Sequence, residues 1–258
     1  MKLSQRLLAA ASLVTPGSRP ADIGTDHGYL PIFLVQKGLA PSALAADINT
    51  GPLLRAEEHI RREGLEDKIE LRLMDGIGGL TPEDEIDTIV IAGMGGALTV
   101  RILEGGDPAV IARCRELVLA PQSEIGDVRE YLSSAGFVIT TEEFVFEDGK
   151  YYPMMRAQHL PEGEEPRYLR PEEARYGPCL LAGAHPVLRK YLEREKKIQE
   201  SILAGLPDEK ELGDEAALRI AQRRREVLST LGLNRLALER MEEGKDQSCP
   251  RRSEKNCT

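Results

Sequence analysis

Residues 21–31 read A-D-I-G-T-D-H-G-Y-L-P and place a polar, glycine-rich turn between two apolar segments. The residues just before the turn, 19–24, predict a short buried strand, and residues 29–38 predict a helix that ends at Gly38. A strand that leads through such a turn into a helix is the repeating unit of parallel sheets. Ligands of these sheets bind beyond the carboxyl ends of the strands, which is where this turn lies.

The alternation of strand-like and helix-like segments continues to residue 158. Further strands are predicted at residues 42–47, 69–76, 87–96 and 116–120, and helices at residues 1–14, 51–64 and 124–136. Two segments rich in β-forming residues, 137–146 and 151–159, flank Asp148-Gly149, a strong hairpin signal. We therefore expect an α/β fold with a doubly wound parallel sheet, to which the hairpin adds an antiparallel strand at one edge.

The composition changes after Leu160. Residues 161–171 are rich in proline and charge, which is typical of a linker. Apolar residues at helical spacing in 185–206 and 214–241 predict an antiparallel hairpin of two long helices, with a break at 205–213. The last residues contain no core-forming side chains and are expected to be disordered. The expected domains are 1–159, an α/β ligand-binding domain, 160–243, a helical hairpin domain, and 244–258, a disordered tail.

The composition is that of an ordinary globular protein. Of 258 residues, 41% are hydrophobic and 30% charged, and no apolar run approaches the length of a membrane span. The N-terminus lacks the ordered regions of a signal peptide, so a cytoplasmic protein with no membrane partner is expected. The four cysteines are scattered without a C-x-x-C pair, which argues against a zinc site or a disulfide framework, and no metal is expected.

The net charge of −9 is unevenly distributed. Residues 1–158 contain 15 Lys and Arg against 24 Asp and Glu, whereas residues 159–258 contain 19 of each. The second part carries basic clusters that can contact phosphate, although they are equally compatible with the solvated face of a helix. These candidate RNA-binding residues are Arg189, Lys190, Lys196, Lys197, Arg223, Arg224 and Arg225.

The turn after the first predicted strand has the pattern Asp22-x-Gly24-x-x-x-Gly28. This spacing differs from the G-x-G-x-x-G turn that binds a dinucleotide pyrophosphate. Gly24 lets a ligand approach the backbone, and the following helix offers free N–H groups to a carboxylate or a phosphate. Asp22 can accept a hydrogen bond from an ammonium group, so an amino-acid-bearing ligand fits; an ordinary glycine turn is the alternative.

Three more motifs fall at strand ends. Asp47 ends the second strand, where a carboxylate can hold both hydroxyls of a ribose. Asp75-Gly76 follows the third strand, where a carboxylate can accept from an adenine amino group. Gly93-Met94-Gly95-Gly96 follows the fourth strand and suits the approach of a planar group. Each alone is also compatible with a cap or a turn, but together they describe an adenosine joined to an amino acid, as in S-adenosyl-L-methionine.

The stretches D-I-G-T-D-H-G-Y-L-P, A-D-I-N, M-D-G and I-A-G-M-G-G resemble the bacterial tRNA (adenine(22)-N(1))-methyltransferase family. The resemblance extends from residue 1 to about residue 240. It implies a Rossmann-like class I methyltransferase domain followed by a C-terminal α-helical coiled-coil domain. It also implies methylation of N1 of adenine 22 in tRNA, with S-adenosyl-L-methionine as the methyl donor. The choice between a monomer and a homodimer stays open.

The resemblance also implies roles for individual residues. The cofactor site would comprise Asp22, Gly24, Gly28, Asp47, Ile48, Asp75, Gly76, Gly93, Met94, Gly95 and Gly96. The Asn-Pro-Pro-Tyr-like motif of other amino-group methyltransferases is absent at Gly93–Gly96. At the fifth strand the sequence has Ala120-Pro121-Gln122 where Gln-Pro-Asn is common in the family, and Gln122 is a candidate for the role of that amide.

Asp26, His27 and Tyr29 are the candidate catalytic residues, because they follow Gly24 at the expected mouth of the site. Tyr29 is expected to stack on the target base, and Asp26 or His27 to take the proton released as the ring becomes cationic. Their alternatives are a core tyrosine and helix caps. Other function classes stay open: a small-molecule methyltransferase, an NAD(P)-dependent dehydrogenase, and a non-catalytic RNA-binding protein that kept the fold.

Overall fold

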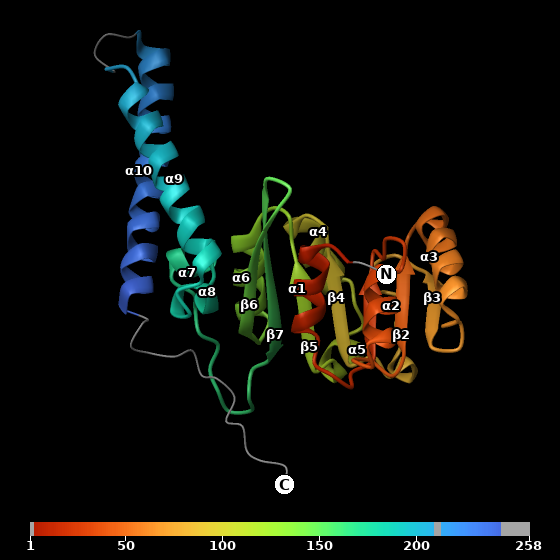
Figure 1. The fold of residues 1–258 in the computed structure, drawn as a ribbon. Helices are drawn as coiled ribbons and strands as arrows, with labels where there is room; N and C mark the ends of the chain where they lie inside the picture. The colour runs from red at the N-terminus through yellow and green to blue at the C-terminus, as the bar shows by residue number, and fades with distance from the viewer. Residues whose placement is uncertain (1–2, 209–212, 244–258) are drawn as a thin grey trace. The chain divides into compact units, whose positions relative to one another are not determined.

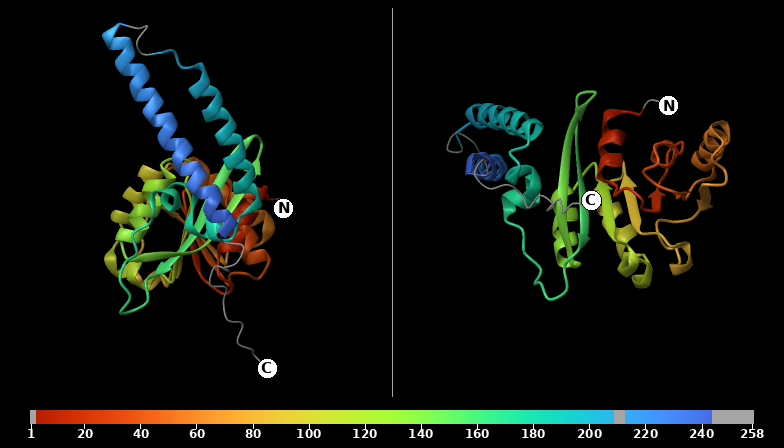
Figure 2. Two further views of the ribbon diagram at one scale, coloured as in Figure 1. Left: turned by 90° about the vertical axis from the view of Figure 1, so that its left-hand side faces the viewer. Right: turned by 60° about the horizontal axis from the view of Figure 1, so that its bottom comes forward.

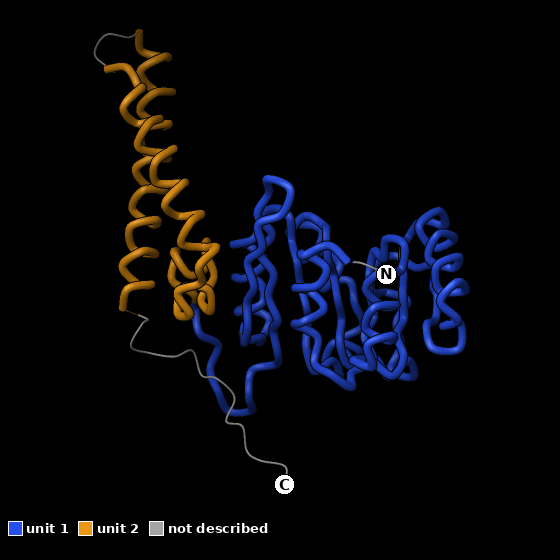
Figure 3. The backbone as a smooth tube through the Cα atoms, viewed as in Figure 1, with its two compact units in different colours: residues 1–168 blue, residues 169–258 orange. Residues whose placement is uncertain are grey.

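The computed structural model describes residues 3–208 and 213–243. The chain forms two compact units, Met1–Tyr168 and Leu169–Thr258 (Figure 3). The segment after Leu160, expected to begin the linker, is attached to the first unit. There the Leu160 amide donates to Gly136 O at 2.8 Å, and Ser133 Oγ donates to Arg167 O at 2.5 Å. The predicted tail, residues 244–258, lies outside the described residues.

A seven-stranded sheet forms the centre of the first unit, with the order β3-β2-β1-β4-β5-β7-β6 (Figure 1). The strands are β1 Pro20–Ile23, β2 Ala43–Asp47, β3 Ile69–Leu73, β4 Thr88–Ala92, β5 Glu116–Ala120, β6 Phe137–Glu147 and β7 Lys150–His159. Strands β1 to β5 are parallel, β7 is antiparallel to β5, and β6 is antiparallel to β7. The predicted doubly wound sheet is confirmed, and both arms of the hairpin extend it.

Helices cover both faces of this sheet. They are α1 Gln5–Leu13, α2 Tyr29–Gln36, α3 Thr50–Glu63, α4 Gly96–Glu104, α5 Pro108–Arg113 and α6 Ile125–Ser134, with a short 3₁₀ helix, η1, at Pro82–Asp84. Alternate residues of the buried strands point to opposite faces, as strand geometry requires. Val90 packs with α1, α2 and α3, whereas Ile89 and Ile91 pack with α4, α5 and α6. The sequence pattern did not single out α4 or α5.

The direction in which the strands are added reverses at β1. Strand β1 pairs with β2 on one side and with β4 on the other, and Ile23 at its carboxyl end lies opposite Ile91 of β4. The connections that follow β1 and β4 therefore leave on opposite faces of the sheet and open a crevice between them. This position is where the fold favours a ligand, and the turn at residues 24–28 lies there.

The second unit is helical (Figure 2). Its helices are α7 Pro171–Tyr176, α8 Pro178–Ala182, α9 Pro186–Gly205 and α10 Asp214–Glu243. The two long helices were predicted, whereas α7 and α8 fall in a proline- and glycine-punctuated stretch whose pattern did not reveal them. Leu188 and Leu192 of α9 and Val227 of α10 are buried in the core of this unit. None of the helices in the described ranges is long and apolar enough to span a membrane.

A buried carboxylate ties the elements of this second unit together. Glu195 of α9 accepts hydrogen bonds from Tyr176 Oη at 2.6 Å, Asn234 Nδ2 at 3.0 Å and Arg175 Nη2 at 2.9 Å. These donors come from α7 and α10. Because a buried carboxylate is costly unless it is paired, the network favours one register of the two long helices.

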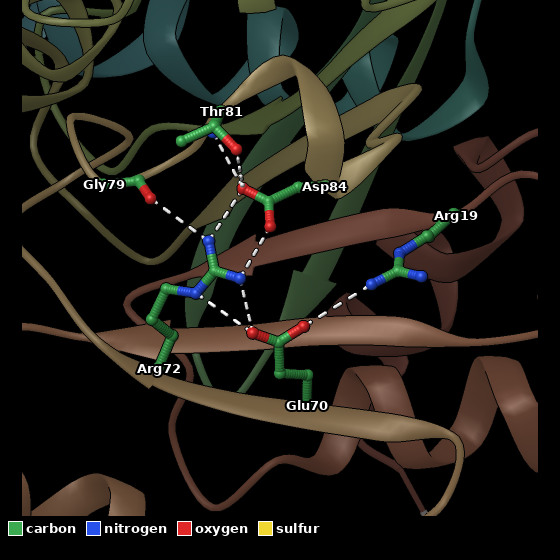
Figure 4. Close-up of polar contacts among 6 residues, drawn as sticks. All are labelled: Arg19, Glu70, Arg72, Gly79, Thr81 and Asp84. Atoms are coloured by element: carbon green, nitrogen blue, oxygen red, sulfur yellow. Dashed lines mark hydrogen bonds and ion pairs between the residues drawn. The ribbon is translucent and has the colours of Figure 1, made fainter.

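An ion-pair cluster closes the connection between β3 and β4, which carries Asp75 and Gly76 (Figure 4). Arg72 of β3 donates from Nη1 and Nη2 to the two carboxylate oxygens of Asp84, at 2.7 and 2.6 Å, and also contacts Glu70. The Thr81 amide donates to the same Asp84 carboxylate at 2.7 Å. The hydrogen bonds from Arg72 lower the pKa of Asp84 to about 2.

This depressed pKa predicts how stability depends on pH. Because the folded-state pKa of Asp84 lies below its ordinary 3.8, its stabilisation is complete above pH 4 and is lost as the pH falls towards 2. We expect Asp84→Asn to lower the urea midpoint of unfolding at pH 6, and we expect the difference from the unsubstituted protein to shrink between pH 4 and pH 2.

The matched control is Asp67→Asn, which removes an exposed carboxylate that has no ion pair among the described residues. It should leave the midpoint unchanged throughout. A difference for Asp84→Asn that stays constant down to pH 2 would contradict the assignment of the stabilisation to the Asp84 carboxylate.

Candidate active site

The turn after β1 folds back onto the end of β2. The amides of Gly24 and Thr25 both donate to Ala46 O, at 2.8 and 2.9 Å. Gly24 and Gly28 have φ values of +74° and +67°, in the left-handed region that glycine adopts without strain. Gly28 is the N-cap residue of α2. The turn therefore places the start of α2 at the carboxyl edge of the sheet.

Asp22, the third residue of β1, is buried with only 8% of its surface exposed. The pKa of its carboxyl group is raised to about 6, chiefly by burial and in smaller part by the nearby carboxylates of Asp26 and Asp47. Loss of hydration penalises the charged form unless an opposite charge lies close by. Asp22 is thus a buried acid suited to receive a cation.

A cleft of about 230 Å³, here called the main cleft, opens beside this carboxylate. One wall comes from β1, the following turn and α2, and the other comes from the N-terminal segment and α1. The lining residues are Leu3, Ser4, Arg6, Leu7, Asp22, Gly24, Asp26, Tyr29, Leu30 and Ala92. A helix near the N-terminus was predicted, but its sequence pattern gave no sign that it belongs to the site.

Arg6 brings a positive charge to this wall of the main cleft. Its guanidinium carbon lies 5.7 Å from the ring centroid of Tyr152, and within the described chain its side chain forms no hydrogen bond or ion pair. The main cleft therefore has a buried acid on one side and an arginine without a carboxylate partner on the other. The pattern Ser4-x-Arg6 carried no sequence signal for this role.

The β6–β7 hairpin holds α1 in place. The Glu147 carboxylate accepts from the amides of Gln5 at 2.6 Å and Arg6 at 3.3 Å, and Ser4 Oγ accepts from the Leu7 amide at 3.4 Å. A carboxylate at a helix N-terminus satisfies unpaired N–H groups and interacts favourably with the helix dipole. Two segments more than 140 residues apart thus determine where Arg6 lies.

The ends of β2 and β3 meet beside the main cleft. Asp47 Oδ1 accepts from the Asn49 amide at 2.7 Å, and the Met74 amide donates to Asp47 O at 3.0 Å. Ile48 is 59% exposed, and Asp75 is exposed as well. The structure thus brings together two carboxylates and an exposed apolar side chain, which are three of the predicted cofactor-site residues.

The glycine loop after β4 is shaped first by packing. A Cβ added at Gly96 would lie 2.5 Å from Ser123 O and 2.7 Å from Glu124 O, so backbone contacts account for this glycine. A Cβ added at Gly24 would lie 2.1 Å from Met94 Cε. The Met94 side chain therefore lies against the turn after β1, and the loops after β1 and β4 are in direct contact.

The three predicted catalytic residues lie together at the mouth of the main cleft. His27 Nε2 is 3.3 Å from Asp26 Oδ1, and the rings of His27 and Tyr29 are nearly parallel with centroids 5.2 Å apart. A third ring, His59 of α3, lies 5.2 Å from Tyr29 and places Nδ1 2.9 Å from His27 O. His59, which the sequence analysis missed, supports His27 in its left-handed conformation at φ +62°.

The predicted basic residues lie on α9 and α10 and differ in exposure. Lys190, Lys196, Lys197, Arg223 and Arg225 are exposed, and Arg189 and Arg224 are half-buried. Arg224 donates to Pro207 O at 3.0 Å, which is a structural contact within the hairpin.

Arg194 is a further exposed cation on α9. With Lys190 and Lys197 it forms an i, i+4, i+7 row on one face, here called the basic stripe. At roughly 100° per residue this face lies opposite the buried Leu188, Leu192 and Glu195. None of the three cations of the stripe has an acidic partner among the described residues.

Among the described residues, no group of three or more His, Cys, Asp or Glu side chains is arranged to hold a metal ion. The polar groups at the carboxyl edge are instead spread along the main cleft and the ends of β2 and β3. This distribution fits an elongated organic ligand better than a compact ion.

Comparison with known proteins gives consistent matches. Residues 20–226 match the family described as tRNA (adenine(22)-N(1))-methyltransferase. The Bacillus subtilis enzyme of that name is 38% identical over 158 residues, which are 61% of this chain and 66%, just under two thirds, of that relative.

Solved structures extend the match. The crystal structure of the B. subtilis M1A22 tRNA methyltransferase has a TM-score of 0.76 at 29% identity, covering 92% of this chain and 99% of that one. The Streptococcus pneumoniae protein Sp1610, solved in complex with S-adenosyl-L-methionine, has a TM-score of 0.78 at 30% identity, covering 92% of this chain and 100% of that one.

The raised pKa of Asp22 predicts that this residue destabilises the ligand-free protein. Its ionisation costs folding free energy fully above pH 6 and not at all below pH 3.8, and the shift corresponds to roughly 3 kcal/mol. We expect Asp22→Asn to raise the melting temperature of the ligand-free protein at pH 8, with a gain that disappears as the pH falls towards 4.

Asp75→Asn serves as the control, because it neutralises an exposed carboxylate at the same edge of the sheet. It should give no pH-dependent gain. A melting temperature that falls at pH 8 in Asp22→Asn would show that the buried carboxylate is already compensated within the protein.

Proposed function

The chain belongs to the tRNA (adenine(22)-N(1))-methyltransferase family, and from this premise we propose that it methylates N1 of adenine 22 in bacterial tRNA. S-adenosyl-L-methionine is the methyl donor, tRNA is the partner, and the reaction takes place in the cytoplasm. The assignment rests above all on one observation, the buried Asp22 carboxylate in the main cleft, which no cation of the described residues neutralises.

The main cleft fits the amino-acid end of the cofactor. An α-amino acid carries an ammonium group and a carboxylate, and the cleft has Asp22 on one wall and the Arg6 guanidinium on the other. Asp22 would hold the ammonium, and its pKa would then fall because an opposite charge favours the ionised form. Arg6 would hold the carboxylate in a charge-assisted hydrogen bond. Gly24 adds no side chain of its own to this cleft, and the Met94 side chain packs where its Cβ would lie.

The ends of β2 and β3 fit the adenosine end. One oxygen of Asp47 is engaged by the Asn49 amide, which leaves the other to accept from the ribose hydroxyls. Ile48, largely exposed at the same edge, offers an apolar surface to the adenine ring. Asp75 would accept from the adenine amino group, and the Arg72–Asp84 pair fixes the connection that carries it.

Methyl transfer to adenine N1 requires mainly that N1 be aligned with the methyl group and the sulfur. When bound, S-adenosyl-L-methionine supplies a methyl group on a positively charged sulfur. Adenine N1 has a lone pair of its own, so the attack requires no general base, and the chain contributes by holding the two reactants in line. N1 lies on the Watson–Crick edge, so a paired target base must leave its helix before it can react.

We assign to Asp26 and His27 the stabilisation of the product. Methylation at N1 makes the ring cationic, and a nearby carboxylate or imidazole can accept the proton that the exocyclic amine then releases. Asp26 has its carboxylate 76% exposed and 3.3 Å from His27 Nε2, so the pair faces the solvent side of the cleft. Tyr29, predicted to stack on the base, packs instead against two imidazole rings, and we assign it to shaping the cleft.

The basic stripe supports tRNA as the substrate. Residues 1–158 are strongly acidic, so we expect the phosphates of tRNA to bind to basic residues in the second part of the chain. Lys190, Arg194 and Lys197 present three charges, without acidic partners in the described ranges, on the face of α9 that points away from its core. A small-molecule methyltransferase would have no use for such a surface.

The test of the function is methyl transfer from labelled S-adenosyl-L-methionine to unmodified bacterial tRNA, followed by nucleoside mass spectrometry. We expect 1-methyladenosine, and we expect it to be absent when adenine 22 is replaced by uridine. Product of another identity, or an unchanged yield with the replaced tRNA, would contradict the proposal.

The basic stripe gives a second prediction. Replacing Lys190, Arg194 and Lys197 together by alanine should weaken tRNA binding and reduce the slope of log affinity against log salt by roughly two to three. The affinity for S-adenosylhomocysteine should not change. Binding is measured by filter retention between 50 and 300 mM salt.

Lys196→Ala is the matched control. Lys196 was predicted to bind RNA, but its ammonium lies 3.9 Å from the Glu200 carboxylate and on another face of the same helix, so we leave it out of the proposed phosphate-binding surface. We expect a salt slope close to that of the unsubstituted protein. An unaltered slope in the triple variant would exclude the basic stripe as the phosphate-binding surface.

A further inference from the structure

A second, smaller cleft adjoins the main cleft, and no part of the cofactor has been assigned to it. Its lining residues are Arg6, Leu7, Ala10, Ala92, Gly93, Ala120, Gln122, Tyr152 and Met154. Arg6, Leu7 and Ala92 also line the main cleft, so the two spaces share a wall. The second cleft has a volume of about 10 Å³, which is room for about one water molecule.

The sheet register puts Tyr152 beyond the carboxyl end of β5. Strand β7 runs antiparallel to β5 with Met155 opposite Leu119, so the residues before Met155 extend past Ala120. Tyr152 and Met154 lie two residues apart and share the face that packs with α1. The aromatic ring therefore lies at the same edge of the sheet as Asp22 and the glycine loop.

A planar cation now covers this ring. The Arg6 guanidinium lies 5.7 Å from the Tyr152 ring centroid and has no other polar partner in the described parts of the chain. Guanidinium groups and nucleobases are both planar and both stack on aromatic side chains. Arg6 also lines the main cleft, where the carboxylate of a bound amino acid would attract its guanidinium.

We propose that the second cleft receives the target adenine, which takes the place of the Arg6 guanidinium on the ring of Tyr152. The inference rests on the proposed function and names the groups that bind the acceptor base. It assigns stacking to Tyr152, over whose ring the Arg6 guanidinium lies, rather than to Tyr29, whose ring has the imidazole rings of His27 and His59 as neighbours.

Gln122 supplies the recognition of the base. An amide side chain can pair with N6 and N7 of adenine through two hydrogen bonds, and guanine does not present the same pattern. Such a contact leaves N1 free to react. The Gln122 amide N–H donates to Met94 O at 2.8 Å, which fixes the backbone, while the exposed side chain forms no hydrogen bond within the described residues.

The first test compares two substitutions at the stacking residue. Tyr152→Leu should lower kcat/KM for tRNA by roughly 10- to 100-fold, because it removes a base–aromatic stack. Tyr152→Phe keeps the ring and should stay within about twofold of the unsubstituted enzyme. Both variants should bind S-adenosylhomocysteine normally, which shows that α1 and the main cleft are intact.

The second test needs no change in the core. A tRNA with 7-deazaadenine at position 22 lacks the N7 acceptor, so we expect the unsubstituted enzyme to methylate it roughly tenfold more slowly. Gln122→Ala should methylate the adenine tRNA and the 7-deazaadenine tRNA equally slowly. The matched control is Ser123→Ala, at the exposed position next to Gln122, which should keep the full sensitivity to N7.

The outcomes separate the two proposals. If the unsubstituted enzyme transfers no methyl group to tRNA, the proposed function is wrong. If it is active, and Tyr152→Leu matches Tyr152→Phe or Gln122→Ala keeps its sensitivity to N7, the function stands and the assignment of the second cleft is overturned.

Discussion

The Asp22 carboxylate is the constraint around which the site is organised. It is buried at the carboxyl end of β1, where strand order reverses, and nothing in the described chain neutralises its charge. Burial of an unpaired charge is tolerated in proteins mainly where function requires it. Together with this acid, the turn at residues 24–28 and the Arg6 guanidinium form the cleft in which we place the ammonium and the carboxylate of the cofactor.

The two clefts share one wall, so the methyl donor in the main cleft and the acceptor base in the second cleft can be bound separately and still be aligned. The shared wall is α1, whose Arg6 lies between the main cleft and the ring of Tyr152. Its position depends on Glu147, in a hairpin at the far end of the domain sequence. The β6–β7 hairpin therefore extends the sheet and also places the helix that divides the site.

Much of this architecture follows from sequence periodicity. The apolar strands, the glycine turns and the acids at strand ends are local patterns, so the parallel sheet could be predicted, and with it the position of Asp22, Asp47 and Asp75 at or just beyond the ends of strands. The contributions of Arg6, His59 and Tyr152 could not, because they depend on contacts between distant segments. Helices α4, α5, α7 and α8 were missed because glycine or proline at their starts obscures the helical pattern.

The most direct measurement of the central claim is the number of protons released when S-adenosylhomocysteine binds, obtained by calorimetry in buffers of different ionisation enthalpy. If Asp22 has a pKa of about 6 in the free protein and is ionised beside the ligand's ammonium group, about half a proton should be released at pH 6 and almost none at pH 8. Asp22→Asn should abolish the release. Binding without proton release at pH 6, or with proton uptake, would contradict the account.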